Sequence, residues 1–116
     1  MTTHTGGCHC GRIAFMVDGE IGSAYDCNCS MCLKRGGLLW FVPRETFTLT
    51  TPEADLGTYR FNTHRLTHHH CPACGIATFS EGVGPDGKPM AAINLRCLDG
   101  IDVDALTVVK IDGRSF

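Results

Sequence analysis

Closely spaced cysteines are the feature that most constrains the fold of this chain. Seven of the eight cysteines fall in three clusters, Cys8-His9-Cys10, Cys27-Asn28-Cys29-Ser30-Met31-Cys32 and Cys71-Pro72-Ala73-Cys74-Gly75. Thiolates two or three residues apart can converge on one zinc ion, whereas they are poorly placed to form disulfides with each other. Because a tetrahedral zinc ion takes four ligands, seven thiols indicate one closed four-thiolate site and a second site with a vacant position.

Length and charge limit the classes of protein that the chain can represent. Its 116 residues predict a single domain, residues 1–116, whose modest core metal ions would help to stabilise. A net charge of −2 and a pI of 6.3, with no run of like charges, disfavour a nucleic-acid or membrane partner. No stretch of the sequence has the length and apolarity of a membrane span.

The cysteines and the first residues of the chain also indicate the cellular compartment of the protein. Residues 1–7 lack the basic and apolar regions of a signal peptide, so we expect a cytoplasmic protein. In a reducing compartment, clustered cysteines favour metal ligation. A disulfide framework remains the alternative interpretation, because eight is an even number of cysteines.

The apolar pattern predicts short strands rather than helices. Apolar and polar residues alternate at 12–17, 47–49 and 59–61, and further strands are expected at 76–80, 90–95 and 108–111. The continuous apolar run 38–42 suits a strand buried on both faces, which would place Trp40 and Phe41 in the core. At most a short helical turn covers 30–35. The sequence therefore predicts an all-β domain with its cysteines at strand ends and turns.

The first and third clusters predict a closed zinc site. Alternate residues of an extended segment project to one side, so Cys8 and Cys10 can reach the same ion. Cys71 and Cys74, followed by Gly75, have the form of a zinc knuckle, in which backbone N–H groups point at the sulfurs. The alternative is a dithiol redox motif, which needs a helix at this point, whereas a strand-like run follows Gly75.

The middle cluster predicts the site with a vacancy. Cys27, Cys29 and Cys32 can converge on one ion, although Cys97 or a histidine could complete a second structural site instead. Three thiolates make a bound zinc ion a weak Lewis acid, which argues against hydrolysis. Such a site is better suited to hold a substrate thiol as its thiolate, ready to attack a carbonyl carbon.

Other polar residues have weaker claims to function. His68-His69-His70 is interpreted as a polar strand or turn, or alternatively as a source of one partner for a zinc-bound thiolate. His9 should face away from the metal, and Cys97 should be a small buried residue. Four basic residues could receive substrate carboxylates, although exposed basic residues are common: Arg12, Lys34, Arg35 and Arg65.

The order of the motifs resembles that of a known family. Cys-x-Cys, Cys-x-Cys-x-x-Cys and Cys-Pro-x-Cys-Gly, followed by Asn94-Leu-Arg-Cys-Leu-Asp99, are similar to the glutathione-dependent formaldehyde-activating enzymes, which include the centromere protein V type of domain. The resemblance runs from about Gly6 to Asp99 and takes in Trp40-Phe-Val-Pro43 and Leu56-Gly-Thr-Tyr59. One departure is Leu33, where an arginine is expected beside Lys34.

This resemblance implies a β-tent fold of short antiparallel strands that holds two Zn²⁺ ions. The structural zinc would be held by Cys8, Cys10, Cys71 and Cys74, and the catalytic zinc by Cys27, Cys29 and Cys32. The implied activity is that of a carbon–sulfur lyase, which combines glutathione with formaldehyde, or a related thiol with a related aldehyde, to give S-(hydroxymethyl)glutathione or its analogue.

Two other functions stay open at this point. One is a non-catalytic, zinc-stabilised module that carries thiols or binds a protein. The other is a nucleic-acid-binding zinc ribbon, which the acidic charge balance and the lack of a basic stripe disfavour.

Overall fold

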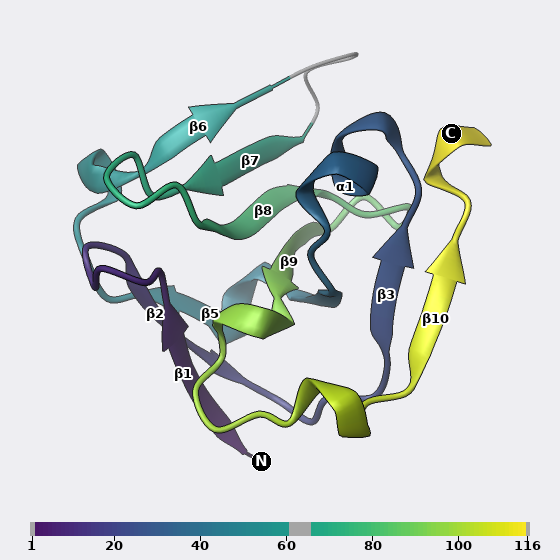
Figure 1. Cartoon of the computed structure of the whole chain (residues 1–116), viewed down its shortest axis with the longest axis horizontal. Coiled ribbons are helices and arrows are strands. Elements are labelled where there is room, and N and C mark those ends of the chain that lie inside the picture. The colour runs from purple at the N-terminus through teal and green to yellow at the C-terminus, as the bar shows by residue number, and fades with distance from the viewer. Residues whose placement is uncertain (1, 61–65, 116) are drawn as a thin grey trace.

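The computed structural model describes residues 2–60 and 66–115 and contains two β-sheets of short strands (Figure 1). The smaller sheet has three antiparallel strands, in the order β1 (Thr3–Gly7), β2 (Ala14–Asp18) and β5 (Phe47–Leu49). The larger sheet has seven strands, in the order β10 (Val108–Ile111), β3 (Ala24–Cys27), β4 (Leu39–Pro43), β9 (Pro89–Asn94), β8 (Ala77–Val83), β7 (Thr67–His70) and β6 (Gly57–Tyr59).

Helical segments in the described chain are short. The α-helix α1 (Ser30–Arg35) joins β3 to β4 and covers the predicted helical turn. Single 3₁₀ turns, labelled η1 to η5, occupy Arg44–Thr46, Glu53–Asp55, Leu95–Cys97, Val103–Ala105 and Gly113–Ser115. The predicted all-β class is therefore confirmed.

One strand pair departs from the expected antiparallel arrangement. β10 pairs with β3 in parallel, and the two strands lie side by side at one edge of the large sheet (Figure 1). Parallel neighbours need a long crossover connection, and here most of the chain lies between the two strands. The segment 98–107 returns the chain to the end of the sheet at which β3 also begins (Figure 1).

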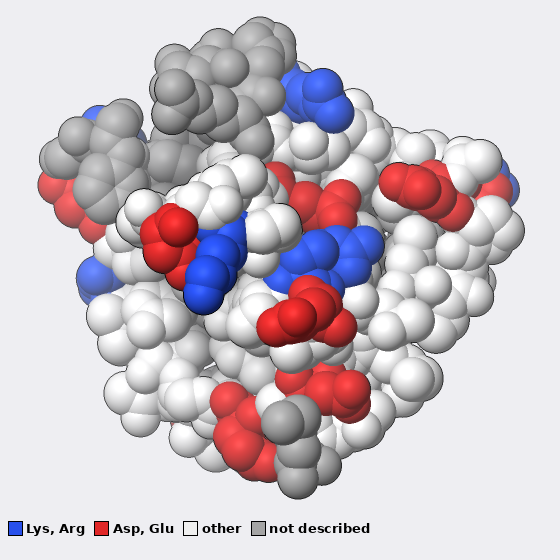
Figure 2. All heavy atoms as spheres, turned by 180° about the vertical axis from the view of Figure 1, so that it is seen from behind, with Lys and Arg blue, Asp and Glu red and all other residues white. Residues whose placement is uncertain are grey.

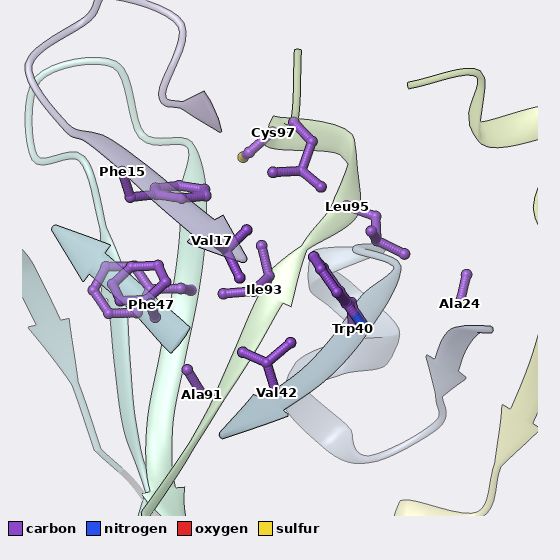
Figure 3. Close-up of a cluster of buried hydrophobic side chains, with 12 residues drawn as sticks. Phe15, Val17, Ala24, Trp40, Val42, Phe47, Ala91, Ile93, Leu95 and Cys97 are labelled. Atoms are coloured by element: carbon purple, nitrogen blue, oxygen red, sulfur yellow. The ribbon is translucent and has the colours of Figure 1, made fainter. Parts of the chain in front are cut away.

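Alternate residues of the strands meet between the two sheets and form the core (Figure 3). The aromatic rings of Phe15, Phe47 and Phe79 pack together, with centroids 5.2 Å apart for Phe15–Phe47 and 4.4 Å apart for Phe47–Phe79. Ile93 is fully buried beside them. The whole cluster comprises Phe15, Val17, Ala24, Trp40, Val42, Phe47, Phe79, Ala91, Ile93, Leu95, Cys97 and Leu98.

The apolar run 38–42 forms β4, but this strand is buried on one face only. Trp40 and Val42 face the core, as the alternation of a strand requires. The prediction that Phe41 lies in the core is wrong, because this side chain is 41% exposed. Its ring packs on Tyr25, 5.4 Å away between centroids, on the opposite face of the sheet.

Strands rich in polar residues were the ones that the apolar pattern missed. β1, β3 and β7 have too few apolar residues to give an alternating signal. Pairing with neighbouring strands stabilises their extended conformation instead. The strands predicted at 47–49, 76–80, 90–95 and 108–111 are confirmed to within a few residues. Of the strand predicted at 59–61, the last residue lies outside the described residues, and β6 covers Gly57–Tyr59.

β1 holds the start of the chain against the segment that follows η3. The backbone N–H of Asp99 donates to the Thr5 carbonyl at 2.8 Å, and Gly6 pairs with Leu98. A Cβ atom at Gly6 would lie 2.5 Å from the Cys97 carbonyl oxygen, so only glycine permits this approach. The turn that follows β1 carries Cys8 and Cys10, so this contact positions both.

Charged side chains of both signs are interspersed over the face seen in Figure 2, without a continuous basic stripe. This distribution on that face agrees with the small net charge of −2. Within the described residues, no helix has the length and apolarity required to cross a membrane.

We expect Ile93→Ala to lower the free energy of unfolding by about 3 kcal/mol, because it leaves a cavity at a fully buried position. Urea unfolding of the metal-loaded protein measures this change. The matched control is Val109→Ala on β10, where the side chain is 39% exposed and the expected loss is below about 1 kcal/mol. Equal losses in the two variants would contradict the description of the core.

Candidate metal centre

Four thiols from two distant turns converge at one point of the structure. Cys8 and Cys10 lie in the turn between β1 and β2, and Cys71 and Cys74 lie in the turn between β7 and β8. All four sulfur atoms lie within 4.8 Å of one another. The Cys10 sulfur lies 3.7 Å from that of Cys8 and 3.6 Å from that of Cys71.

These distances fit a zinc ion. Four sulfurs at about 2.3 Å from a tetrahedral zinc lie about 3.8 Å from each other. The shortest observed separations fall close to this value and far above the S–S bond length of about 2.05 Å. The structure joins none of the eight cysteines in a disulfide, which contradicts the alternative of a disulfide framework. The four-thiol cluster could therefore hold one metal ion.

Backbone N–H groups point at the sulfurs of this four-thiol cluster. The N–H of Ile13 donates to Cys8 Sγ at 3.3 Å, and that of Cys74 donates to Cys71 Sγ at 3.4 Å. The backbone N–H of Ile76 lowers the pKa of the Cys74 thiol to about 6. Such donors favour the thiolate form, which is the form that binds metal.

The two turns reach this geometry in different ways. Cys71–Gly75 forms the predicted knuckle, in which Gly75 has a φ of 82° and donates its N–H to the Cys71 carbonyl at 2.8 Å. The expectation that Cys8 and Cys10 lie on an extended strand is wrong. β1 ends at Gly7, and the chain then bends back so that the Cys8 N–H donates to the Ile13 carbonyl at 3.0 Å.

A second group contains three thiols. Cys27 ends β3, Cys29 is the N-cap of α1 and Cys32 lies in the first helical turn. Their sulfurs lie within 4.8 Å of one another, and no other cysteine, histidine or carboxylate of the described residues belongs to the group. This three-thiol cluster could hold a second metal ion, with three protein ligands.

The N-cap position explains the electrostatics of the three-thiol cluster. Burial raises the pKa of the Cys29 thiol, but the hydrogen bonds that the thiol accepts together outweigh burial and the pKa is lowered. The largest of these contributions comes from the N–H of Cys32, at 3.3 Å from the Cys29 sulfur. Burial, together with the neighbouring Cys29, raises the pKa of Cys32. The Cys29 thiol therefore ionises more readily than the Cys32 thiol.

The eighth cysteine, Cys97, belongs to neither cluster. Cys97 is buried, and its thiol donates to the Ala77 carbonyl at 3.5 Å. Burial raises its pKa to about 11, so it stays protonated near neutral pH. This agrees with the prediction of a small buried residue. His9, between the two ligand candidates of the first cluster, is exposed and belongs to neither group.

The three histidines lie in β7, which confirms the interpretation as a strand, although two of them are buried. His69 contacts Thr58 Oγ1 at 3.1 Å and Glu81 Oε2 at 2.8 Å, and Glu81 also pairs with Arg44. His68 contacts Ser80 Oγ at 2.8 Å, and burial lowers its pKa to about 4. These contacts join neighbouring strands of the large sheet.

The basic residues that could receive carboxylates differ in their surroundings. Arg12 pairs with Asp55 at 3.2 Å and Lys34 is exposed, while Arg65 lies outside the described residues. Arg35 is half-buried. Burial lowers the pKa of its guanidinium, and the thiol groups of Cys32 and Cys29 act in the opposite direction. Of the three basic residues in this set that the structure describes, Arg35 is the one that interacts with thiols of the three-thiol cluster.

Comparison with known proteins identifies the family. The sequence model of the glutathione-dependent formaldehyde-activating enzymes matches residues 3–109. The chain belongs to this family. Its structure is similar to the crystal structure of a Rhodobacter sphaeroides protein, with a TM-score of 0.80 and 23% identity, over 92% of this chain and 99% of that one. This likeness concerns the fold and agrees with the expected β-tent architecture.

Sequence reasoning missed a segment that packs on the three-thiol cluster, and this segment lies beyond the family match. Asn28 donates its side-chain amide to Asp112 at 3.0 Å and accepts the N–H of Arg114 at 3.1 Å. These bonds hold Gly113 so close to the cluster that a Cβ atom there would lie 2.4 Å from Cys27 Sγ. Its only sequence signal is a glycine followed by an arginine, which is too common to be informative.

We expect Gly113→Ala to weaken metal binding at the three-thiol cluster by roughly tenfold, because the added methyl group displaces the Cys27 sulfur at a cost of about 1–3 kcal/mol. Titration with Co²⁺, followed through its thiolate charge-transfer absorption and by competition with a chelator, measures the affinity. The matched control is Gly22→Ala, where an added Cβ meets nothing within 4 Å. Unchanged affinity in Gly113→Ala would contradict this account of the packing.

Proposed function

We propose that this chain is a zinc-dependent carbon–sulfur lyase that adds a thiol to formaldehyde or a related aldehyde, as an S-(hydroxymethyl)glutathione synthase does. Membership of the glutathione-dependent formaldehyde-activating enzymes supports a role in glutathione-related formaldehyde chemistry. The observation that carries the finer proposal is the unequal division of thiols, four in one cluster and three in the other. In this proposal, the four-thiol cluster is structural and Cys27, Cys29 and Cys32 are catalytic.

The donor sets match these two roles. Four thiolates complete the coordination of a tetrahedral zinc ion, so a metal held by Cys8, Cys10, Cys71 and Cys74 has no position for substrate. A zinc ion held by Cys27, Cys29 and Cys32 would keep an incoming thiol in its thiolate form at the remaining position.

The residues around the three-thiol cluster set its geometry. α1 places Cys29 and Cys32 on one helical turn, where the N–H of Cys32 donates to Cys29 Sγ at 3.3 Å. The side chain of Asn28 holds the segment 112–114 against the same cluster. The positive charge of Arg35 would partly compensate the negative charge of three thiolates at this cluster.

The proposed reaction forms one carbon–sulfur bond. The thiol sulfur donates an electron pair to the aldehyde carbon, the C=O π electrons move to the oxygen, and the proton lost by the thiol is taken up by that oxygen. No oxidant or reductant is needed, and the reverse steps release thiol and aldehyde. We also propose that the protein acts in the cytoplasm, because reactive thiol clusters of this kind persist in a reducing compartment.

Substitution in each cluster should separate the two roles. We expect Cys29→Ser to reduce turnover of glutathione and formaldehyde at least about a hundredfold while the fold is retained, because it removes a ligand at a local site. Cys74→Ser should unfold much of the domain, because it opens the site that joins two distant turns. Adduct formation, circular dichroism and zinc content measure these effects, with two zinc ions expected in the unmodified chain.

The control is Cys97→Ser, which removes a thiol outside both clusters and should keep both zinc ions. Equal unfolding of the Cys29→Ser and Cys74→Ser variants would indicate two structural sites and would contradict the proposed enzyme.

The rate of adduct formation distinguishes a non-catalytic thiol carrier from an enzyme. Thiols add to formaldehyde spontaneously, so we expect the zinc-loaded protein to raise the rate of adduct formation above the spontaneous rate at the same concentration of free thiol. The Cys29→Ser variant should return the rate to the spontaneous value. A protein that binds the thiol without raising the rate would be a carrier.

A further inference from the structure

The segment that follows β10 lies against the three-thiol cluster. β10 runs parallel to β3 with Ile111 opposite Cys27, so the chain leaves the sheet beside the first thiol of the cluster (Figure 1). Residues 112–115, which include the turn η5, then form a strap. A Cβ atom at Gly113 would lie 2.4 Å from Cys27 Sγ and 3.2 Å from Cys29 Cβ. The strap therefore covers the side of the cluster that these two cysteines form.

One side chain fastens the strap. Asn28, between the first two thiols of the cluster, donates its side-chain amide N–H to Asp112 Oδ1 at 3.0 Å and accepts the backbone N–H of Arg114 at 3.1 Å. Its own backbone N–H donates to the Ile111 carbonyl at 3.1 Å. The two bonds of the side chain lie on either side of Gly113 in the sequence, so together they hold this residue against the cluster.

The strap has the features of a segment that opens locally. β10 is an edge strand of the large sheet, and its first three residues are exposed. Asp112 and Arg114 are exposed as well, and so are the two hydrogen bonds that Asn28 makes with the strap. Segments with few buried contacts and exposed hydrogen bonds open far more often than the core of a protein does.

The thiols themselves are held by regular structure. Cys27 ends β3, and Cys29 and Cys32 belong to the cap and the first turn of α1. The N–H of Leu33 donates to the Cys29 carbonyl at 2.9 Å, and that of Cys32 donates to the Cys29 sulfur at 3.3 Å. These bonds do not involve the strap, so its opening would uncover the thiols without separating them.

We propose that the strap is a gate over the three-thiol cluster and that Asn28 is its latch, so that a metal ion enters or leaves this cluster only while the strap is open. The gate goes beyond the proposed function and does not depend on the reaction that the protein catalyses. Three protein ligands hold an ion by one bond fewer than four ligands do. A cover that closes behind the ion would slow its loss from the cluster with fewer ligands.

A gate and a support for the ligands differ in their kinetics. If the ion passes only through the open form, the rate constants of association and dissociation are both multiplied by the fraction of molecules that are open. Weakening the latch raises this fraction, so both rate constants rise together and Kd changes little. Loss of a segment that only supports the bound ligands would raise the dissociation rate constant and Kd, without faster association.

The test measures both rate constants with Co²⁺, whose thiolate charge-transfer absorption reports binding. Protein that keeps one zinc ion, in the four-thiol cluster, after mild chelation is mixed rapidly with Co²⁺ and then with EDTA, and the rate of loss is extrapolated to zero EDTA. We expect Asn28→Ala to raise both rate constants roughly tenfold, because two hydrogen bonds that favour the closed form are lost.

A second variant tests the same latch from the strap, because Asn28 lies between two ligand candidates. Asp112→Ala removes the acceptor of the Asn28 amide and should also raise both rate constants. Loss of its negative charge would by itself slow the entry of a cation, so faster entry reports opening. Asp112→Asn keeps an oxygen that can accept this bond and should not accelerate either step. The double variant Asn28→Ala/Asp112→Ala should be no faster than Asn28→Ala.

The matched control is Asp102→Ala. It removes a bond of the same kind from the turn η4, where the backbone N–H of Asp104 donates to Asp102 Oδ1 at 3.1 Å. Both rate constants should stay unchanged in this variant, and circular dichroism shows whether each variant is folded.

Two outcomes would overturn the gate. One is faster dissociation with unchanged association in Asn28→Ala and Asp112→Ala, which would make the strap a support. The other is that neither variant changes either rate constant. Neither measurement involves a thiol substrate or an aldehyde, so the gate can fail while the proposed enzyme stands, and the proposed enzyme can fail while the gate stands.

Discussion

The convergence of four thiols from two distant turns is the constraint on which the other features of this structure depend. The sulfurs of Cys10 and Cys71 lie 3.6 Å apart although the two residues are 61 positions apart in the chain. Bringing such distant segments together costs chain entropy that a small core offsets only in part. Thiolates in this geometry can be joined by one metal ion, whose binding free energy then contributes to folding. A bound ion would fix the turn after β1 and the knuckle before β8 to each other.

The three-thiol cluster differs because it is built locally. One strand end and one helical turn, Cys27 to Cys32, bring its sulfurs together, so losing a ligand there should not separate distant parts of the fold. Its surroundings, in contrast, come from far along the chain. Gly113 packs on Cys27, and Asp112 and Arg114 bond to the side chain of Asn28. The proposed structural and catalytic roles follow from this difference: the four-thiol cluster joins distant segments of the chain, whereas the three-thiol cluster is formed by neighbouring residues.

Residue spacing predicted the local features well and the faces of the strands less well. The knuckle at Cys71–Gly75 and the helical turn at Ser30–Arg35 follow from short-range geometry, and both are present. Phe41 was expected in the core because an apolar run does not show which of its faces is covered, and only the tertiary structure leaves one face of β4 open. The histidines of β7 show the opposite case, because a polar segment is buried where neighbouring strands supply its hydrogen-bond partners.

The sequence by itself determined which atoms are available for chemistry: seven clustered thiols at spacings that suit metal ligation, an all-β pattern and a family membership that the motif order indicated. The tertiary structure decided what stands around them. It placed Gly113 against Cys27, and it brought Asp112 and Arg114 within hydrogen-bond distance of Asn28. The physical reason is that ligand spacing within a turn is set by local backbone geometry, whereas these neighbours are set by the order and register of the strands, to which residues throughout the chain contribute.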